Sequence, residues 1–167
     1  EASHSKYVRQ KLPELPRSAF LIEPGRRGTA NCIIFALDYI ARHRGHSEPI
    51  AFIHSDHHVR DVGNFARSFM VASKISQKYK QITLIGIKPT FPSIGFGYIK
   101  SGKSISVNQN AFRVESFKEK PDYNTAKSYL ESDKYLWNCG YFVGSINTFL
   151  DEMKRSAPDL LQRYEKL

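Results

Sequence analysis

The apolar positions of the chain form short continuous runs that alternate with stripes at helical spacing. Apolar runs at residues 19–23, 50–54 and 82–87 predict strands, and the run at 50–54 is typical of a strand buried on both faces. Between these runs, apolar residues three or four positions apart predict helices over residues 29–42 and 62–70. This alternation predicts an α/β fold in which the first strands pair in parallel and helices cover the sheet.

The second half of the chain has a different pattern, in which strands follow loops rather than long helices. We expect it to add an antiparallel portion, so that the whole sheet is mixed. No repeat or linker-like stretch interrupts the chain, so residues 1–167 are predicted to form a single domain. The predicted elements are strands at 98–100, 113–119 and 137–145 and helices at 123–132, 146–155 and 159–166.

The composition is that of an ordinary globular protein, and we expect it in the cytoplasm. Hydrophobic residues make up 41% and charged residues 25% of the 167 positions. No apolar run reaches the roughly 20 residues that a membrane-spanning helix needs. The first residues carry no export signal. Two cysteines, Cys32 and Cys139, make no disulfide framework, which favours a reducing compartment.

The net charge of +9 favours anionic partners such as nucleotides and sugar phosphates. Lys and Arg are spread along the chain without a run of five or six, which argues against a nucleic-acid binder. A solvated basic surface without a specific partner also explains the charge. The sequence does not decide whether the chain forms a homo-oligomer.

The loop after the first predicted strand, residues 23–29, is one candidate ligand site. Its glycines let the backbone approach a ligand closely. Arg26, Arg27 and the N-terminus of the next helix attract anions. The alternative is a plain turn in which Thr29 caps the helix and the arginines face water.

Asp56 follows the buried strand at 50–54 and is a candidate ligand of Mg²⁺. A hard cation prefers carboxylate and phosphate oxygens together. The alternative is that Asp56 is a loop or capping residue. Three nearby histidines (His54, His57 and His58) raise zinc as another alternative, but their spacing is not a familiar zinc pattern.

Three later segments have residues that suit a sugar phosphate. Gly97, in a glycine-rich loop, allows peptide groups to approach sugar hydroxyls. Glu119 and Lys120 precede Pro121 at a strand end, where strand alternation puts their side chains on opposite faces unless a bulge intervenes. Asn138 is a polar residue in an aromatic strand. A ligand-free loop, an exposed salt bridge and a satisfied bulge are the respective alternatives.

In this order, the segments EPGRRGTA, SDHH, KPTFPSIGFGYI, FKEKPD and YLWNCGYF resemble the middle of the mannose-1-phosphate guanylyltransferases, from about Lys6 onward. KPT…GFGYI with EKPD and YLWNCG is specific to sugar nucleotidyltransferases, and EPGRRGTA with YLWN favours the guanylyl, mannose-directed branch. The resemblance implies a three-layer α-β-α, Rossmann-like fold of the nucleotide-diphosphosugar transferase type. Its mixed sheet would be incomplete in this chain.

The same resemblance implies that GTP and mannose 1-phosphate are converted to GDP-mannose and pyrophosphate with Mg²⁺ as cofactor. A sugar phosphate oxygen would attack the α-phosphorus, and the protein would position the reactants and neutralise charge. The implied roles are the guanine nucleotide for Arg27 and Thr29, the catalytic metal for Asp56, the sugar for Gly97, Glu119 and Asn138, and the sugar phosphate during catalysis for Lys120.

The chain also departs from the family pattern. Residues 28–31 replace a usual Asn-Thr-Ala-Pro, His54-Ser55 replaces Pro-Ala, and Ile94 replaces Thr. The family's N-terminal glycine-rich loop and a second metal-binding aspartate have no counterpart, so we expect the 167-residue chain alone to be inactive or nearly so. Two alternatives stay open: a sugar nucleotidyltransferase for another base or for a glucose phosphate, and a non-catalytic sugar-nucleotide-binding module.

Overall fold

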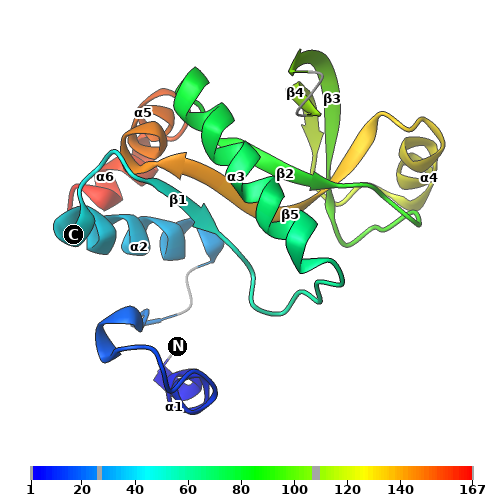
Figure 1. Ribbon diagram of the computed structural model, residues 1–167. Helices are drawn as coiled ribbons and strands as arrows, with labels where there is room; N and C mark the ends of the chain where they lie inside the picture. Colours follow the sequence, from blue (N-terminus) through cyan, green and yellow to red (C-terminus); the bar gives the residue numbers. More distant parts are fainter. Residues whose placement is uncertain (1, 26–27, 107–109, 167) are drawn as a thin grey trace. The chain divides into compact units, whose positions relative to one another are not determined.

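A computed structural model of the chain describes residues 2–25, 28–106 and 110–166 (Figure 1). The chain divides into two compact units, and each is described by itself. The first combines Glu1–Glu48 with Leu150–Leu167, and the second is Pro49–Phe149.

The first unit is helical. It contains α1 (Ala2–Lys11), the 3-10 helix η1 (Arg17–Ala19), α2 (Thr29–Arg44) and α6 (Pro158–Tyr164). Ile34 and Leu37, on the predicted apolar stripe of α2, are buried. Helix α6 packs against α2, and Arg163 Nη1 donates a hydrogen bond to Asn31 Oδ1 at 3.0 Å. The predicted helix at 29–42 is therefore confirmed and extends two residues further.

The strand predicted at residues 19–23 is wrong. These residues form the end of η1 and irregular backbone. A strand requires a neighbour for its backbone hydrogen bonds, and within the described residues this segment takes part in no ladder. The segment is instead tied to α2, because the Tyr39 hydroxyl donates to the Ser18 carbonyl at 3.0 Å.

The second unit contains a five-stranded sheet. Its strands are β1 (Pro49–Phe52), β2 (Thr83–Ile87), β3 (Gly97–Ser106), β4 (Ala111–Lys118) and β5 (Tyr135–Ser145). The order is β1-β5-β3-β4, and β2 also pairs with β5. The α/β class predicted from the sequence is confirmed, and the proteins of similar structure described below share this fold.

The parallel pairing expected in the first part of the sheet is wrong. Every described ladder is antiparallel, because β5 returns from late in the chain and pairs with both β1 and β2. Phe142 and Val143 pair with both strands, so β1 and β2 lie on opposite sides of β5. They run in the same direction without pairing with each other.

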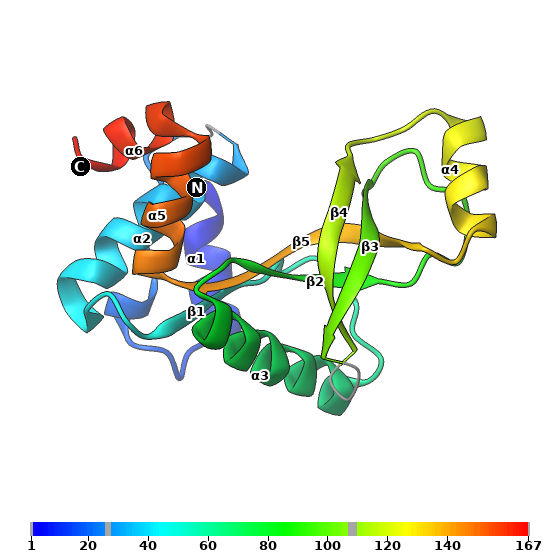
Figure 2. The same cartoon turned by 90° about the horizontal axis from the view of Figure 1, so that it is seen from above.

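Two helices cover parts of this sheet. Helix α3 (Val62–Tyr79) packs against β1, β2 and β5 (Figure 2). On its predicted stripe, Phe65 and Phe69 meet the ring of Tyr141 in edge contacts, with centroids 5.5 and 5.8 Å away. Val62 and Met70, predicted on the same stripe, are exposed instead. The remaining helix of the second unit is α4 (Tyr123–Glu131), and α5 (Ile146–Ser156) begins where β5 ends.

Helix α4 builds a separate aromatic core on the other part of the sheet. Tyr98 of β3, Trp137 of β5 and Ala126 of α4 are buried together. Asp122 caps the helix by accepting hydrogen bonds from the backbone N–H and the hydroxyl of Thr125, and these bonds lower the pKa of its carboxyl. Trp137 therefore faces this core, and its neighbour Asn138 must face the other way.

Candidate functional site

A row of three residues crosses three neighbouring segments of the second unit. Asn138 of β5 pairs with Gly97 of β3. The next pair, Tyr98 with Lys118, places Glu119 opposite Gly97 on the far side. A Cβ atom added to Gly97 would lie only 2.6 Å from Glu119 Oε2, so the carboxylate packs directly against the glycine. The structure thus brings together three of the predicted sugar-binding residues.

Two positions at the centre of this row lack side chains, and neighbouring side chains, Leu136 at Gly86 and Glu119 with Phe117 at Gly97, lie over them. Asn138 is flanked across the ladders by Gly86 on one side and Gly97 on the other. Oδ1 of the Asn138 side chain accepts a hydrogen bond from the backbone N–H of Gly140 at 3.2 Å, and this bond orients the side-chain amide. Its nitrogen supplies two donors, and Glu119 supplies acceptors, which is the combination that sugar hydroxyls require.

Lys120 lies beside this row through an unusual backbone conformation. It follows Glu119 in a bend just past β4 and has φ of +42°, in the left-handed region. Strand alternation predicted that the two side chains would lie on opposite faces. The bend instead brings Lys120 Nζ within 3.7 Å of Glu119 Oε1. Both side chains stay more than half exposed, so the pair adds little stability and leaves the ammonium accessible to an anion.

Such a conformation costs a non-glycine residue on the order of 1–2 kcal/mol. The next residue, Pro121, restricts the backbone of Lys120 further. A strained backbone at a charged, accessible side chain favours a binding role for Lys120 over an incidental turn.

Asp56 lies in the loop that continues β1. Its carboxylate is 85% exposed and lies 4.0 Å from Nε2 of His57. The other ring nitrogen of His57, Nδ1, is 2.5 Å from the hydroxyl of Tyr141 on β5. Burial raises the pKa of the Tyr141 phenol, with further contributions from Cys139 and from the Asp56 carboxylate, so Tyr141 stays protonated and can donate.

A single exposed carboxylate fits one mode of Mg²⁺ binding. Mg²⁺ keeps several waters and is commonly held by one or two carboxylates together with substrate phosphates, rather than by a protein cage. Across residues 2–25, 28–106 and 110–166, no three His, Cys, Asp or Glu side chains are grouped closely enough to hold a metal ion. The rings of His54 and His57 are 5.2 Å apart, but the structure offers zinc no third ligand within that part of the chain.

The residues predicted to lie near the nucleotide belong to the first unit. Arg27 lies outside the described residues. Thr29 is exposed and is the first residue of α2, while Gly28, with φ of +84°, occupies the N-cap without a side-chain hydrogen bond. Capping by Thr29, the alternative considered above, is therefore wrong.

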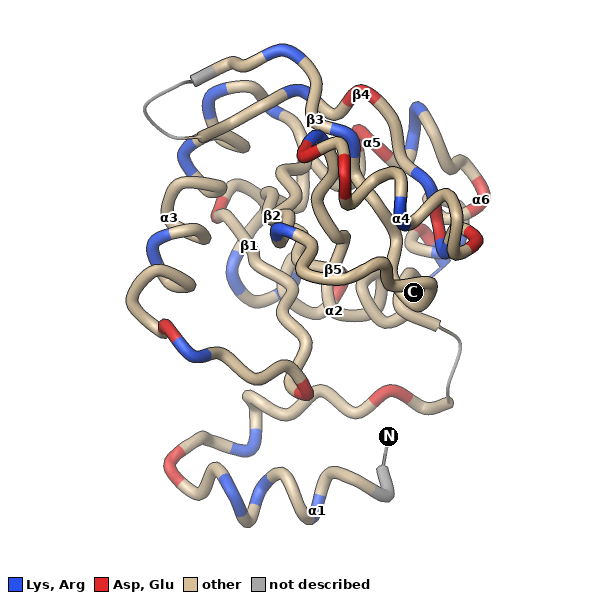
Figure 3. The backbone as a smooth tube through the Cα atoms, turned by 90° about the vertical axis from the view of Figure 1, so that its right-hand side faces the viewer, with Lys and Arg blue, Asp and Glu red and all other residues tan. Residues whose placement is uncertain are grey.

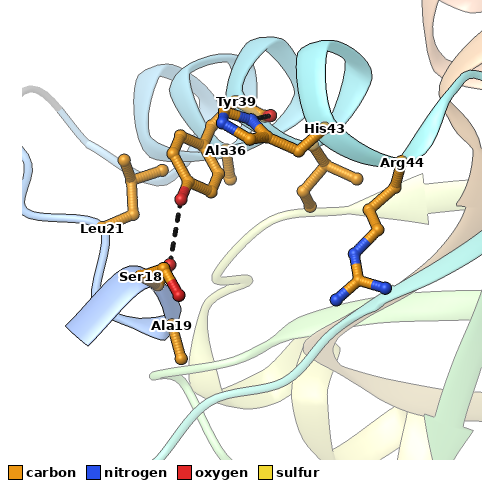
Figure 4. A pocket seen from close by; sticks show the side chains of 8 residues that line it. Ser18, Ala19, Leu21, Ala36, Tyr39, His43 and Arg44 are labelled. Atoms are coloured by element: carbon orange, nitrogen blue, oxygen red, sulfur yellow. Dashed lines mark hydrogen bonds between the residues drawn. The ribbon is translucent and has the colours of Figure 1, made fainter. Parts of the chain in front are cut away.

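The first unit also has an open hollow between η1 and α2 (Figure 4). The Tyr39 ring stacks on His43 there, with centroids 4.3 Å apart, and Arg44 lies at one side. None of the predicted site residues lines this hollow, whose lining residues are Ser18, Ala19, Leu21, Ala36, Tyr39, Ile40, His43 and Arg44.

The charged positions do not gather on one element. Figure 3 shows Lys and Arg distributed over helices, strands and loops, with Asp and Glu among them. Among the described residues, no helix combines the length and apolar character needed to cross a membrane.

Several residues of this region were missed by reasoning from the sequence. Gly86 lies in an apolar run without a motif, and Gly140 and Tyr141 lie in the segment YLWNCGYF, where only Asn138 was singled out. A signal was present only for Gly140, which stands directly after the polar residue of an aromatic strand, in Trp137-Asn138-Cys139-Gly140. In the structure its φ is +73°, and an added Cβ would collide with the ring of His54.

Known proteins share both the sequence and the fold of this chain. Residues 2–167 match the family described as Nucleotidyl transferase. The xanthan biosynthesis protein XanB of Xanthomonas campestris is 39% identical over 150 residues, which cover 89% of this chain and 31% of XanB. The mannose-1-phosphate guanylyltransferase of Escherichia coli is 33% identical over 168 residues, covering 98% of this chain and 35% of that protein.

Solved structures agree with these matches. A Thermus thermophilus protein described as a mannose-1-phosphate geranyltransferase superposes with a TM-score of 0.83 at 25% identity, over 96% of this chain and 45% of that one. A Helicobacter pylori mannose-6-phosphate isomerase gives a TM-score of 0.83 at 26% identity, over 99% and 61%. The chain spans about a third of the length of the curated relatives it matches.

Replacing Gly97 by alanine tests whether a sugar binds at this glycine. The atoms that a new Cβ would meet, Glu119 Oε2 and Phe117 Cζ, are ends of side chains that can move aside. We therefore expect Gly97→Ala to change the free energy of unfolding by less than about 1 kcal/mol. Binding of mannose 1-phosphate should weaken by more than about tenfold, because the methyl group displaces the Glu119 carboxylate and stands between the sugar and the backbone of Gly97. Urea unfolding and titration calorimetry measure the two effects.

Gly63→Ala is the matched control, because the nearest atom to its added Cβ lies 3.6 Å away on Asp61. It should leave the binding of mannose 1-phosphate unchanged. Equal binding of mannose 1-phosphate by Gly97→Ala and the unmodified protein would show that the sugar does not bind at Gly97.

Replacing Gly140 tests the contact with His54. Gly140→Ala should lower the free energy of unfolding by more than the about 1–2 kcal/mol that a left-handed residue costs, because the new methyl group also meets the His54 ring. Adding His54→Ala should restore the steric part alone. Urea unfolding of the two single variants and the double variant gives the coupling between them. Additive losses would show that His54 does not lie against Gly140.

Proposed function

The chain belongs to the nucleotidyl transferase family, and from this premise we propose that the full-length protein transfers a guanylyl group from GTP to mannose 1-phosphate. An oxygen of the sugar phosphate attacks the α-phosphorus of GTP. A new P–O bond forms there, the bond to the oxygen of the β-phosphate breaks, and pyrophosphate leaves with that electron pair. The products are GDP-mannose and pyrophosphate.

The row formed by Asn138, Gly97 and Glu119 is the observation that carries this proposal. At Gly97 the sugar would meet peptide groups, because this position has no side chain and the Glu119 carboxylate lies directly beside it. The Asn138 amide donates to its hydroxyls, and Glu119 accepts from them. The relatives named mannose-1-phosphate guanylyltransferase support mannose as this sugar.

Lys120 and Asp56 supply the charge that the reaction requires. The Lys120 ammonium, 63% exposed beside Glu119, pairs with the phosphate of the sugar. Asp56 would hold Mg²⁺, which would supply positive charge to the phosphates of the nucleotide. Arg27 and Thr29 take the side of the guanine nucleotide. The proposed reaction has no covalent enzyme intermediate, so positioning and electrostatics provide the catalysis.

We assign the activity to the cytoplasm. Both cysteines are free thiols, Cys32 exposed and Cys139 half-buried, as a reducing compartment requires.

The choice of base and sugar is tested with the full-length protein. Mannose 1-phosphate and glucose 1-phosphate are each combined with GTP, ATP and dTTP in the presence of Mg²⁺, and release of pyrophosphate is measured. We expect the highest kcat/KM for GTP with mannose 1-phosphate. A preference for dTTP or for glucose 1-phosphate would assign another reaction of the same family. Binding of GDP-mannose without any turnover would make the protein a non-catalytic binding module.

Lys120 provides a second test, because its charge and its strained backbone can be separated. Lys120→Gly removes the ammonium and relaxes the left-handed residue, so the free energy of unfolding should rise by about 0.5–1 kcal/mol. The KM for mannose 1-phosphate should rise at least about tenfold while the KM for GTP changes little. Urea unfolding and steady-state kinetics measure these effects.

Lys120→Arg is the matched control, since it keeps the backbone strain and the positive charge. It should retain most of the affinity for mannose 1-phosphate that Lys120→Gly loses. Equal increases in the KM values of both substrates would remove Lys120 from the sugar phosphate site.

A further inference from the structure

The loop that carries Asp56 is held against β5 after the ladder between β1 and β5 has ended. The last pair of that ladder is Phe52 with Phe142. Beyond it no backbone pairing fixes Asp56, although His57, one residue further, returns to β5 and meets the hydroxyl of Tyr141 at 2.5 Å. A side-chain contact therefore replaces the missing ladder next to the carboxylate.

Tyr141 is a rigid anchor for this contact. Its side chain is only 4% exposed, and it lies within β5, which is paired on both sides at the neighbouring residue Phe142. Phe65 and Phe69 of α3 fix its ring from the helix layer. Its hydroxyl is consequently held in one place, whereas the Asp56 side chain is 85% exposed.

The contact between the Tyr141 hydroxyl and His57 Nδ1 has a geometry in which the phenol can donate to the imidazole. When the Tyr141 hydroxyl donates to Nδ1, the neutral imidazole carries its proton on Nε2. Nε2 is the nitrogen that faces the Asp56 carboxylate, at 4.0 Å from Oδ1. In this tautomer the Nε2–H points toward Asp56 at a separation longer than a hydrogen bond, and neighbours of this kind around a ligating carboxylate affect metal affinity.

A second contact joins the same loop to the sugar-binding row. The ring of His54 lies against the backbone of Gly140, so that a side chain at Gly140 would collide with it. The backbone N–H of Gly140 in turn donates to Oδ1 of the Asn138 side chain. The loop therefore contacts β5 on both sides of Asp56, and one of these contacts leads directly to Asn138.

We propose that Tyr141 and His57 are positioning residues that hold the Asp56 carboxylate at a set place beside the sugar row. The inference rests on the proposed function in one respect, that Asp56 binds the metal of the reaction. Neither residue touches substrate. They set how well Asp56 is aimed at the metal–nucleotide complex, so their loss weakens metal binding without weakening sugar binding.

Tyr141→Phe is the sharpest test, because it removes one oxygen and keeps the buried ring. Binding of Mn²⁺ together with GTP to the full-length protein is followed by the electron paramagnetic resonance of free Mn²⁺. We expect the affinity to fall about tenfold, as for other residues that support a metal ligand. In steady-state assays the Mg²⁺ concentration for half-maximal rate should rise by a similar factor, while the KM for mannose 1-phosphate stays within about twofold.

The tautomer of His57 gives a readout that does not depend on activity. With ¹⁵N-labelled histidine, the full-length protein should show His57 as the Nε2–H form, and Tyr141→Phe should show a mixture of both neutral forms. An unchanged tautomer in Tyr141→Phe, or an unchanged Mn²⁺ affinity, would overturn the proposal. If Tyr141→Phe alters the tautomer as expected but the unmodified full-length protein has no transferase activity, the proposed function is contradicted and the positioning contact is not.

Two further variants separate positioning from a general loss of structure. Tyr39→Phe removes a tyrosine hydroxyl that donates at 3.0 Å to Ser18, and it should leave Mn²⁺ binding unchanged. His57→Asn retains an acceptor near the position of Nδ1 and should recover part of the affinity that His57→Ala loses, but only while Tyr141 is present. An equal loss in Tyr39→Phe, or recovery by His57→Asn in the Tyr141→Phe background, would contradict the proposal.

Discussion

The antiparallel ladders around β5 are the constraint on which the second unit depends. β5 pairs with β2 on one side and with β1 and β3 on the other. A shift of one residue in this strand would turn every side chain to the opposite face. Trp137 would then leave the aromatic core under α4, and Asn138 would enter it as a polar group to be satisfied. Burial of Trp137 therefore keeps Asn138 on the open face.

Glycines serve the same region by leaving space rather than by bending the chain. Gly86 and Gly97 flank Asn138 on both ladders, and neither has a positive φ. Their value lies in the absent side chains, since a Cβ at either position would lie 2.7 Å or less from a neighbouring side-chain atom. Gly140 differs, because its φ of +73° requires glycine in addition to the contact with His54. The strand β5 and its neighbours thus carry the row with Asn138 and also contact the loop with Asp56.

Stability and binding make opposite demands at Lys120. A left-handed lysine before a proline raises the energy of the folded chain, while the same bend brings the ammonium beside the sugar row. Asp56 shows a related arrangement, with an exposed carboxylate 4.0 Å from His57, which in turn contacts the buried Tyr141. In both places the charged group remains accessible, and its backbone or its neighbour is held rigidly. Such preorganisation is what a reaction governed by positioning and charge requires.

Local patterns in the sequence determined most helices and most strands, and the resemblance to a family pattern singled out Gly97, Glu119 and Asn138, which the structure places in one row. The stripe of α2 and the strand β5 each bury residues within one segment, and β2 is a continuous apolar run, so their patterns are visible without the fold. Only the tertiary structure decided which strands pair. It rejected the strand at residues 19–23, which has no partner in the described sheet, and it placed β5 between β1 and β2. It also brought Glu119 to Lys120 and Tyr141 to His57, because backbone bends and contacts between residues 84 positions apart leave no periodic trace in the chain.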